Sequence, residues 1–317
     1  MSDIVKKATR EGYGDGLVEL CKIRPDMVVL DADLAAATKT GTFAKAYPAR
    51  FFNCGIQEGN MMGVAAGLAT TGKLVFASSF AMFAAGRAFE IIRNSIAYPK
   101  LNVKIGATHA GISVGEDGAS HQCNEDIALM RVLPNMTIIN PADDVEAKAA
   151  TLAMANHDGP AYLRFGRLAV PVFNDEKSYK FELGKGIQLR DGDDVTIIAT
   201  GLMVAEALEA FDVLKEQGIN ARIINIHTIK PIDSDIIIKA AKETGKIITV
   251  EEHSVIGGLG SAVCDVLSSS DLAGSVSIKK IGVNDVFGYS GPALELLKKF
   301  GLSSENIVDV TKKFLKK

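Results

Sequence analysis

VTIIATGLMVAEALEAFDVLKEQGINARIINI, residues 195–226, contains one complete strand–helix–strand unit. The apolar runs at 195–199 and 221–226 each predict a buried strand, and apolar residues recur at helical spacing over 204–217 between them. A helix between two buried strands is typical of parallel pairing, because parallel neighbours need a long connection. This unit therefore predicts an α/β fold built on a parallel sheet.

The same alternation extends in both directions from this unit. Further strands are predicted at 27–30, 74–77, 103–107, 137–140, 161–164, 246–251 and 276–281. Further helices are predicted at 13–21, 62–69, 84–97, 124–132, 234–244 and 259–268, and one begins at 144 with Asp143 as its N-cap. The polar segment 171–185 has no clear period and is interpreted as a linker. The sequence thus predicts two doubly wound, mainly parallel-sheet domains, at 1–170 and 186–317.

Composition narrows the function classes. The chain has 317 residues, 47% of them apolar, and a formal net charge of -3 without a Lys/Arg-rich block, so neither nucleic acid nor a membrane surface is an expected partner. The N-terminus does not resemble a signal peptide, and the most apolar stretch, 63–86, is interrupted by polar residues. Four widely separated cysteines without a C-x-x-C pair indicate reduced thiols in the cytoplasm rather than a zinc site.

Three polar segments follow predicted strands or open helices in the first domain, where parallel sheets bind their ligands. They read NCGIQEGNM at 53–61, SFAMF at 79–83 and THAGISVGEDGASHQ at 108–122. From residue types alone, the glutamate of the first is typical of a helix-dipole partner, and the phenylalanines of the second are typical of a core. The third favours a functional site, because two of the five histidines, two carboxylates and several glycines meet in one loop.

Together the three segments resemble the pyrimidine-binding domain of the transketolase family. They match its GIxEHxM-like, TFxxF-like and THDxIGVGEDGPTHQ segments in order and spacing. The second half, with EEH at 251–253 and GGLG at 257–260, is similar to the family's C-terminal domain, so the resemblance covers nearly the whole chain. It implies a transketolase, which transfers a two-carbon ketol unit between sugar phosphates with thiamine diphosphate as cofactor.

The resemblance assigns roles on the cofactor side. Glu58 matches the catalytic carboxylate that hydrogen-bonds the pyrimidine nitrogen and so activates the cofactor. Phe80 and Phe83 match the aromatic wall against that ring, and Asp33 matches a further cofactor-side carboxylate.

It also assigns roles on the substrate side. His109 and His121 match residues that assist proton transfer and bind the sugar. Asp117 matches a residue that accepts a hydrogen bond from a sugar hydroxyl. Arg10 and Arg167 match two arginines that hold the sugar phosphate, for which a guanidinium fork is well shaped.

The chain departs from the family pattern at three positions. Gly59 stands where the family has a histidine, and Gly86 stands in place of a third aromatic wall residue. A phosphate-binding serine falls on Ala37, with Thr38 and Thr40 as candidate replacements. These departures leave the donor and acceptor sugars open.

The diphosphate site of the family is not matched. The GDG at 14–16 lies within a predicted helix and no suitably placed Asn follows it. We therefore expect the C-terminal subunit of a split transketolase, whose N-terminal partner subunit binds the diphosphate and Mg²⁺. Two-fold symmetry then predicts a homodimer of this chain within an α2β2 heterotetramer.

Other functions stay open from the sequence. One is a beta-type subunit of another thiamine enzyme, either a 2-oxo acid dehydrogenase or a deoxyxylulose-phosphate synthase-like protein. A second is a non-catalytic regulatory subunit that kept the fold. A nucleotide-binding Rossmann module is disfavoured, because the glycine turn at 257–260 is an incomplete fingerprint and is better interpreted as a tight structural turn.

Overall fold

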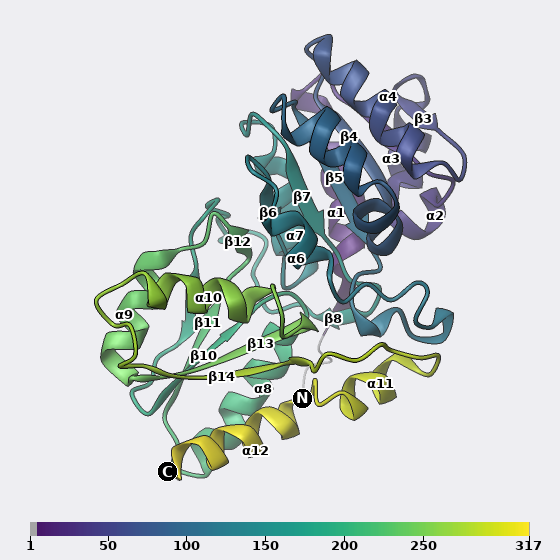
Figure 1. The fold of residues 1–317 in the computed structure, drawn as a ribbon. Helices are drawn as coiled ribbons and strands as arrows, with labels where there is room; N and C mark the ends of the chain where they lie inside the picture. Colours follow the sequence, from purple (N-terminus) through teal and green to yellow (C-terminus); the bar gives the residue numbers. More distant parts are fainter. Residues whose placement is uncertain (1–4, 317) are drawn as a thin grey trace.

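Seven strands form the larger sheet of the computed structural model, which describes residues 5–316 (Figure 1). Their spatial order is β12 (Thr228–Lys230), β6 (Thr137–Ile139), β7 (Ala161–Arg164), β5 (Val103–Thr108), β4 (Val75–Phe80), β2 (Val28–Asp31) and β3 (Phe51–Asn53). All neighbours are parallel except β12, which runs antiparallel to β6. The central strands β4 and β5 are buried along their whole length, as expected for a sheet covered on both faces.

Two groups of helices cover this sheet. One face packs against α1 (Thr9–Ile23), α3 (Thr40–Ala46) and α7 (Asp144–Ala153). The other packs against α4 (Glu58–Thr70), η2 (Met82–Arg87), α5 (Phe89–Ile91), η3 (Ile92–Ala97) and α6 (Asp126–Arg131). Shorter elements are α2 (Ala35–Thr38), η1 (Pro48–Arg50), η4 (Ile112–Asp117) and the antiparallel pair β1 (Lys6–Ala8) and β8 (Ala169–Pro171).

The smaller sheet lies below it in Figure 1, in the green and yellow part of the chain. Its order is β14 (Ser277–Val283), β13 (Lys246–Ser254), β10 (Val195–Ala199), β11 (Ala221–Asn225) and β9 (Ile187–Arg190), with only β9 antiparallel. Its helices are α8 (Met203–Glu216), α9 (Ser234–Thr244), α10 (Leu259–Ser268), α11 (Ala293–Lys299) and α12 (Ser304–Leu315). The predicted fold class, doubly wound α/β with mainly parallel sheets, is confirmed.

The two sheets are more closely joined than the sequence predicts. Strand β12 lies after the linker in sequence, yet it pairs with β6 of the first sheet, Thr228 opposite Ile139. One hydrophobic cluster contains residues from both halves, among them Ile105 of β5 and Ile224 of β11. The C-terminal half therefore completes the edge of the larger sheet and shares its core.

The GDG at 14–16 forms part of α1, as predicted, and its glycines allow close packing of α1 against other elements. The neighbouring Gly12 shows how tight this is, because a Cβ atom there would lie 2.0 Å from the backbone oxygen of Asp144 on α7. The predicted helix at 84–97 is interrupted, since η2 and η3 are π-helical turns on either side of α5. Such wide turns are often found at functional sites.

A buried polar cluster links the linker to both sheets. Glu146 of α7 accepts hydrogen bonds from Tyr179 of the linker and, at 2.9 Å, from Asn225 of β11. Its carboxylate also accepts the backbone N–H of Ala142. Burial raises the pKa of Glu146 to about 7, although these hydrogen bonds oppose the shift.

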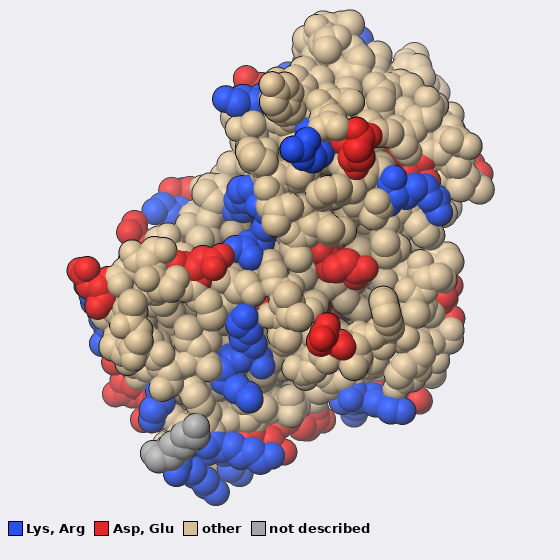
Figure 2. Space-filling model, in the orientation of Figure 1, with Lys and Arg blue, Asp and Glu red and all other residues tan. Residues whose placement is uncertain are grey.

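Charges of both signs are interspersed over the face seen in Figure 2, and wide uncharged areas separate them on the larger-sheet half. Within residues 5–316, none of the helices is both long and apolar enough to cross a bilayer. The four cysteines are unpaired, and two of them, Cys21 and Cys123, are buried.

Candidate active site at the carboxyl ends of the strands

Glu58 is the first residue of α4, and its side chain is only 1% exposed. Position at a helix N-terminus favours a carboxylate, because the helix dipole is positive there. One oxygen lies 2.7 Å from Nη1 of Arg87, and the other accepts a hydrogen bond from Ser79 at 3.3 Å. The structure therefore buries this carboxylate, and it points away from solvent.

An aromatic wall stands beside this carboxylate. Phe80 ends β4 and Phe83 lies one turn on in η2, with their rings nearly parallel and 6.0 Å apart between centroids. The Arg87 guanidinium covers the Phe83 ring at 4.8 Å, so one cation contacts both the wall and Glu58. The predicted motifs at 53–61 and 79–83 therefore lie together, since Arg87 contacts a residue of each.

His109 joins the wall from the third motif. It follows β5 directly and stacks on Phe80 with centroids 3.8 Å apart. Its backbone has a φ of 56°, which is uncommon for a residue with a side chain and is often found at functional sites. Burial, together with the nearby positive charges of Arg10 and Arg167, lowers the pKa of His109 to about 3. The imidazole is therefore neutral at physiological pH, and Nδ1 lies 3.0 Å from the Thr108 hydroxyl.

The second histidine contacts the same two rings edge-on. His121 makes an edge contact with Phe83 at 5.2 Å, and its Nδ1 lies 3.0 Å from the Ser120 hydroxyl. Burial lowers the pKa of Arg10, and the charge of Arg167 lowers it as well, so the two predicted arginines are close enough to interact. Arg10 donates to the backbone of Ala37 at 2.6 Å. The structure therefore places both arginines and both histidines around one region.

Asp117 and Asp33 are more peripheral. Both are exposed, and Asp33 accepts a hydrogen bond from Asn53 at 2.7 Å. Within the described chain Asp117 makes no hydrogen bond through its side chain, whereas its neighbour Glu116 pairs with Arg167 at 2.8 Å. The roles of the two aspartates stay predictions.

The structure corrects the prediction that Thr38 or Thr40 binds a phosphate. Thr38 and Thr40 are buried and donate to the carboxylate of Asp31 at 2.7 and 2.8 Å. Asp31 is itself fully buried, and burial raises its pKa. Both hydroxyl groups are thus used in fixing the turn after β2, and neither is free to bind a phosphate.

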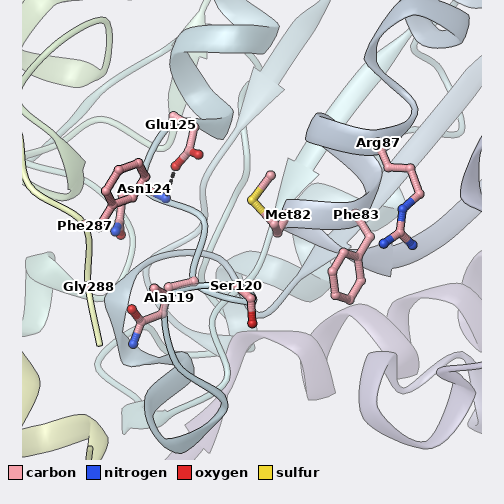
Figure 3. A pocket seen from close by; sticks show the side chains of 10 residues that line it. Met82, Phe83, Arg87, Ala119, Ser120, Asn124, Glu125, Phe287 and Gly288 are labelled. Atoms are coloured by element: carbon pink, nitrogen blue, oxygen red, sulfur yellow. Dashed lines mark hydrogen bonds between the residues drawn. The ribbon is translucent and has the colours of Figure 1, made fainter. Parts of the chain in front are cut away.

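A cavity of about 400 Å³ opens beside the wall. Figure 3 shows Phe83 and Arg87 on one side of it, Phe287 and Glu125 on the other, and Ser120 along the loop below. Phe287 comes from the C-terminal half, so this cavity has walls from both halves. Glu58 and His109 do not line this cavity, but Arg87, which does, contacts the buried carboxylate of Glu58 at 2.7 Å. A buried carboxylate near aromatic rings, with a neutral imidazole stacked on the same wall, suits a flat heteroaromatic ring that presents a hydrogen-bond donor.

Arg87 and Ser79 are site residues to which the sequence assigned no role. Ser79 lies inside a quoted motif, but Arg87 is one arginine within an apolar helical segment and carried no pattern of its own. At the glycine turn 257–260, the backbone N–H groups of Leu259 and Gly260 donate to Glu251 at 2.6 and 2.8 Å. These amides are therefore occupied within the protein, which supports the structural interpretation of that turn.

Comparison with known proteins gives consistent matches. The family model for the transketolase pyrimidine-binding domain matches residues 5–172, and that for the transketolase C-terminal domain matches residues 184–307. A putative transketolase C-terminal section from Methanocaldococcus jannaschii is 57% identical over 96% of this chain and 95% of its own length. A 6-deoxy-6-sulfo-D-fructose transketolase subunit from a Clostridium species is 43% identical over 94% and 92%. A solved split-gene transketolase, described as an inactive beta4 tetramer, superposes with a TM-score of 0.89 at 54% identity and covers 98% of both chains.

Proposed function

This chain belongs to the transketolase family, and we propose that it is the C-terminal subunit of a two-chain, thiamine-diphosphate-dependent transketolase. In this proposal the enzyme transfers a two-carbon ketol unit between sugar phosphates. The observation that supports it most directly is the buried carboxylate of Glu58, which lies beside Phe80 and Phe83, with His109 and His121 packed on the same rings.

The pyrimidine end of the cofactor would be held by Glu58, Phe80 and Phe83. Asp33, which is exposed, would contact the cofactor from the same edge of the sheet. When bound, thiamine diphosphate supplies the carbon nucleophile that takes up the ketol unit. Glu58 would hold a proton at the pyrimidine ring nitrogen, and its burial keeps water from competing for that hydrogen bond. The Phe80 and Phe83 rings would orient the flat ring through apolar contact.

His109 and His121 would move protons at the sugar oxygens. A lowered pKa keeps His109 neutral and makes it a weak base, so its imidazole would act chiefly by hydrogen-bonding a substrate oxygen. His121 is less buried and lies across the same aromatic rings. Two imidazoles on one wall would together assist proton transfer and substrate binding.

Arg10 and Arg167 would bind the substrate phosphate, and Asp117 would accept a hydrogen bond from a sugar hydroxyl. The mutual proximity of the two guanidinium groups supports this, because like charges held close together favour an anion between them. Glu116 pairs with Arg167, so phosphate binding would exchange one anionic partner for another.

An N-terminal partner subunit would supply the diphosphate and Mg²⁺ site, in an α2β2 heterotetramer that contains a homodimer of this chain. Two relatives of similar length are described as a C-terminal section and as a subunit, which supports a split enzyme. We propose the cytoplasm as its compartment, supported by four cysteines that are unpaired. The sugars stay open, because a close relative is named for a sulfonated fructose, and a role in the pentose phosphate pathway is one candidate.

The test is reconstitution with the N-terminal partner subunit. The pair, with thiamine diphosphate and Mg²⁺, should transfer a ketol unit from a ketose phosphate to an aldose phosphate and should not decarboxylate pyruvate. Pyruvate decarboxylation would instead favour a beta-type subunit of another thiamine enzyme. Glu58→Ala should abolish turnover, whereas Glu90→Ala, an exposed glutamate on α5, should leave it within about twofold. Full turnover in the Glu58→Ala pair would favour a non-catalytic subunit.

A further inference from the structure

The loop at 108–122, which carries His109, Asp117 and His121, is anchored by the C-terminal half of the chain. Ile112 is fully buried and belongs to the hydrophobic cluster of the smaller sheet, together with Val250. In Figure 1 the segment that leads into α11 lies beside this loop, and α11 packs against η4.

A single carboxylate of the smaller sheet makes the central polar anchor. Glu252 of β13 is 3% exposed, and its Oε1 accepts the backbone N–H of Ser113 at 2.6 Å. The contact requires a glycine at position 111, whose φ is 84°, because a Cβ atom there would lie 2.3 Å from the same oxygen. The backbone N–H of Gly111 in turn donates to the backbone oxygen of Cys123 at 2.8 Å, and this hydrogen bond joins the two ends of the loop.

The opposite side of Glu252 is also fixed. Its backbone oxygen accepts a hydrogen bond from Arg164 of β7 at 2.9 Å, and Arg164 donates to Asp126 of α6 at 2.8 Å. All three residues are nine-tenths or more buried. A backbone N–H bound to a buried carboxylate is a strong hydrogen bond, and without it a buried donor is left unsatisfied.

From these contacts we infer that Glu252 is a positioning residue, which holds the loop 108–122 so that its histidines face the aromatic wall. The inference rests on the proposed function for its catalytic meaning. It gives the C-terminal domain a role in the active site, since the loop's anchors come from β13 and from the core of the smaller sheet. Burial raises the pKa of Glu252 to about 7, which is the cost of keeping a carboxylate at this position.

The chain contains a matched control for this residue. Glu251 is the preceding residue of β13, is fully buried, and also has a pKa raised to about 7 by burial. Because successive strand residues point to opposite faces, Glu251 accepts the N–H groups at the start of α10 and does not contact the loop. Replacing either glutamate therefore removes a buried acceptor, but at different places.

The experiment compares Glu252→Leu, Glu252→Gln and Glu251→Leu in the full chain by hydrogen–deuterium exchange. Glu252→Leu should speed exchange of peptides within 108–122 by about tenfold or more, because it removes a charge-assisted hydrogen bond. Glu252→Gln keeps a neutral acceptor and should lie between it and the wild type, and it carries the same comparison if the Leu variant does not fold. Glu251→Leu should speed exchange at 257–268 and leave the loop unchanged. Loop exchange at the wild-type rate in both Glu252 variants, or equally fast in Glu251→Leu, would overturn the inference.

The reconstituted pair provides the functional measurement. Glu252→Leu should lower kcat about tenfold to a hundredfold through a misplaced loop, while the Kd for thiamine diphosphate stays within about twofold, because Glu58, Phe80 and Phe83 lie outside the loop. Glu251→Leu should keep kcat within about twofold at a temperature where it is folded. A kcat unchanged in Glu252→Leu would refute the positioning role. Failure of the wild-type pair to transfer a ketol unit would instead refute the proposed function, and the exchange data would still decide where Glu252 acts.

Discussion

Replacing Glu146 by Gln should change how the stability of this protein depends on pH. The carboxylate of Glu146 lies in the polar cluster between α7, the linker and β11, and burial raises its pKa from 4.5 to about 7. A raised pKa means that the folded chain binds this proton more tightly than the unfolded chain. The contribution to stability is therefore fully present below the ordinary pKa and is lost as the pH rises through the folded value.

The magnitude follows from the difference between the two pKa values. Integrating the difference in bound protons from pH 5 to pH 8 gives a loss of about 2–3 kcal/mol in the wild type through this group. Glu146→Gln has no titrating group there, so it does not share this loss. The free energy of unfolding of the variant, minus that of the wild type, should therefore rise by about 2–3 kcal/mol over the same range.

Urea denaturation of both chains at several pH values between about pH 5 and pH 8 measures this difference directly. Tyr179→Phe is the opposite control, because it keeps the carboxyl group but removes a hydrogen bond that lowers the pKa of Glu146. That variant should lose more stability than the wild type as the pH rises. A Glu146→Gln difference that is flat or falls with pH would show that the carboxylate is ionised at little cost in the folded chain, and the reasoning would be wrong.

Other perturbations give equally direct tests. Arg87→Met should strengthen thiamine diphosphate binding to the reconstituted pair about two- to fivefold in a fluorescence titration, because the half-exposed Arg87 guanidinium no longer competes for the buried carboxylate of Glu58; weaker binding would contradict this. The imidazole of His109 should show no titration above about pH 5 in nitrogen NMR spectra, since its pKa is lowered to about 3; a midpoint near pH 6.5 would show an exposed ring. Gly12→Ala should destabilise the chain by about 1–3 kcal/mol through a clash with the backbone of α7. Gly67→Ala on α4 meets no atom within 4 Å and should stabilise it by about 0.5–1 kcal/mol; denaturation curves that rank the two variants the other way would refute the packing argument.

The sequence predicted the fold class and most long elements, because buried parallel strands and their crossover helices leave continuous apolar runs and helical spacing. It missed β12, since three residues of sequence TIK do not form a pattern. Its pairing with β6 depends on tertiary contacts rather than on local propensity. It also missed the π-helical turns, because periodicity distinguishes helix from strand but not one helical pitch from another.

For the site, the residue types alone favoured only the loop at 108–122, and the resemblance supplied the other roles. Glu58 illustrates why: the same position that complements a helix dipole also faces an aromatic wall, and the wall appears only in three dimensions. Thr38 and Thr40 show the converse. A threonine hydroxyl can donate a hydrogen bond to a phosphate, yet both hydroxyl groups already donate to the carboxylate of Asp31. Arg87 had no signal in the sequence at all.

The edge strand β12 has a consequence for building chimaeras between relatives. A crossover within 171–185 would seem to exchange one whole sheet for another, but it would also transplant the strand that covers β6. Donor halves suited to recombination are therefore those whose segment equivalent to 228–230 can pair with Ile138 and Ile139 of the recipient. A mismatched donor would leave a hydrophobic sheet edge open to other chains, so such hybrids should be selected first for solubility and only then for new sugar preferences.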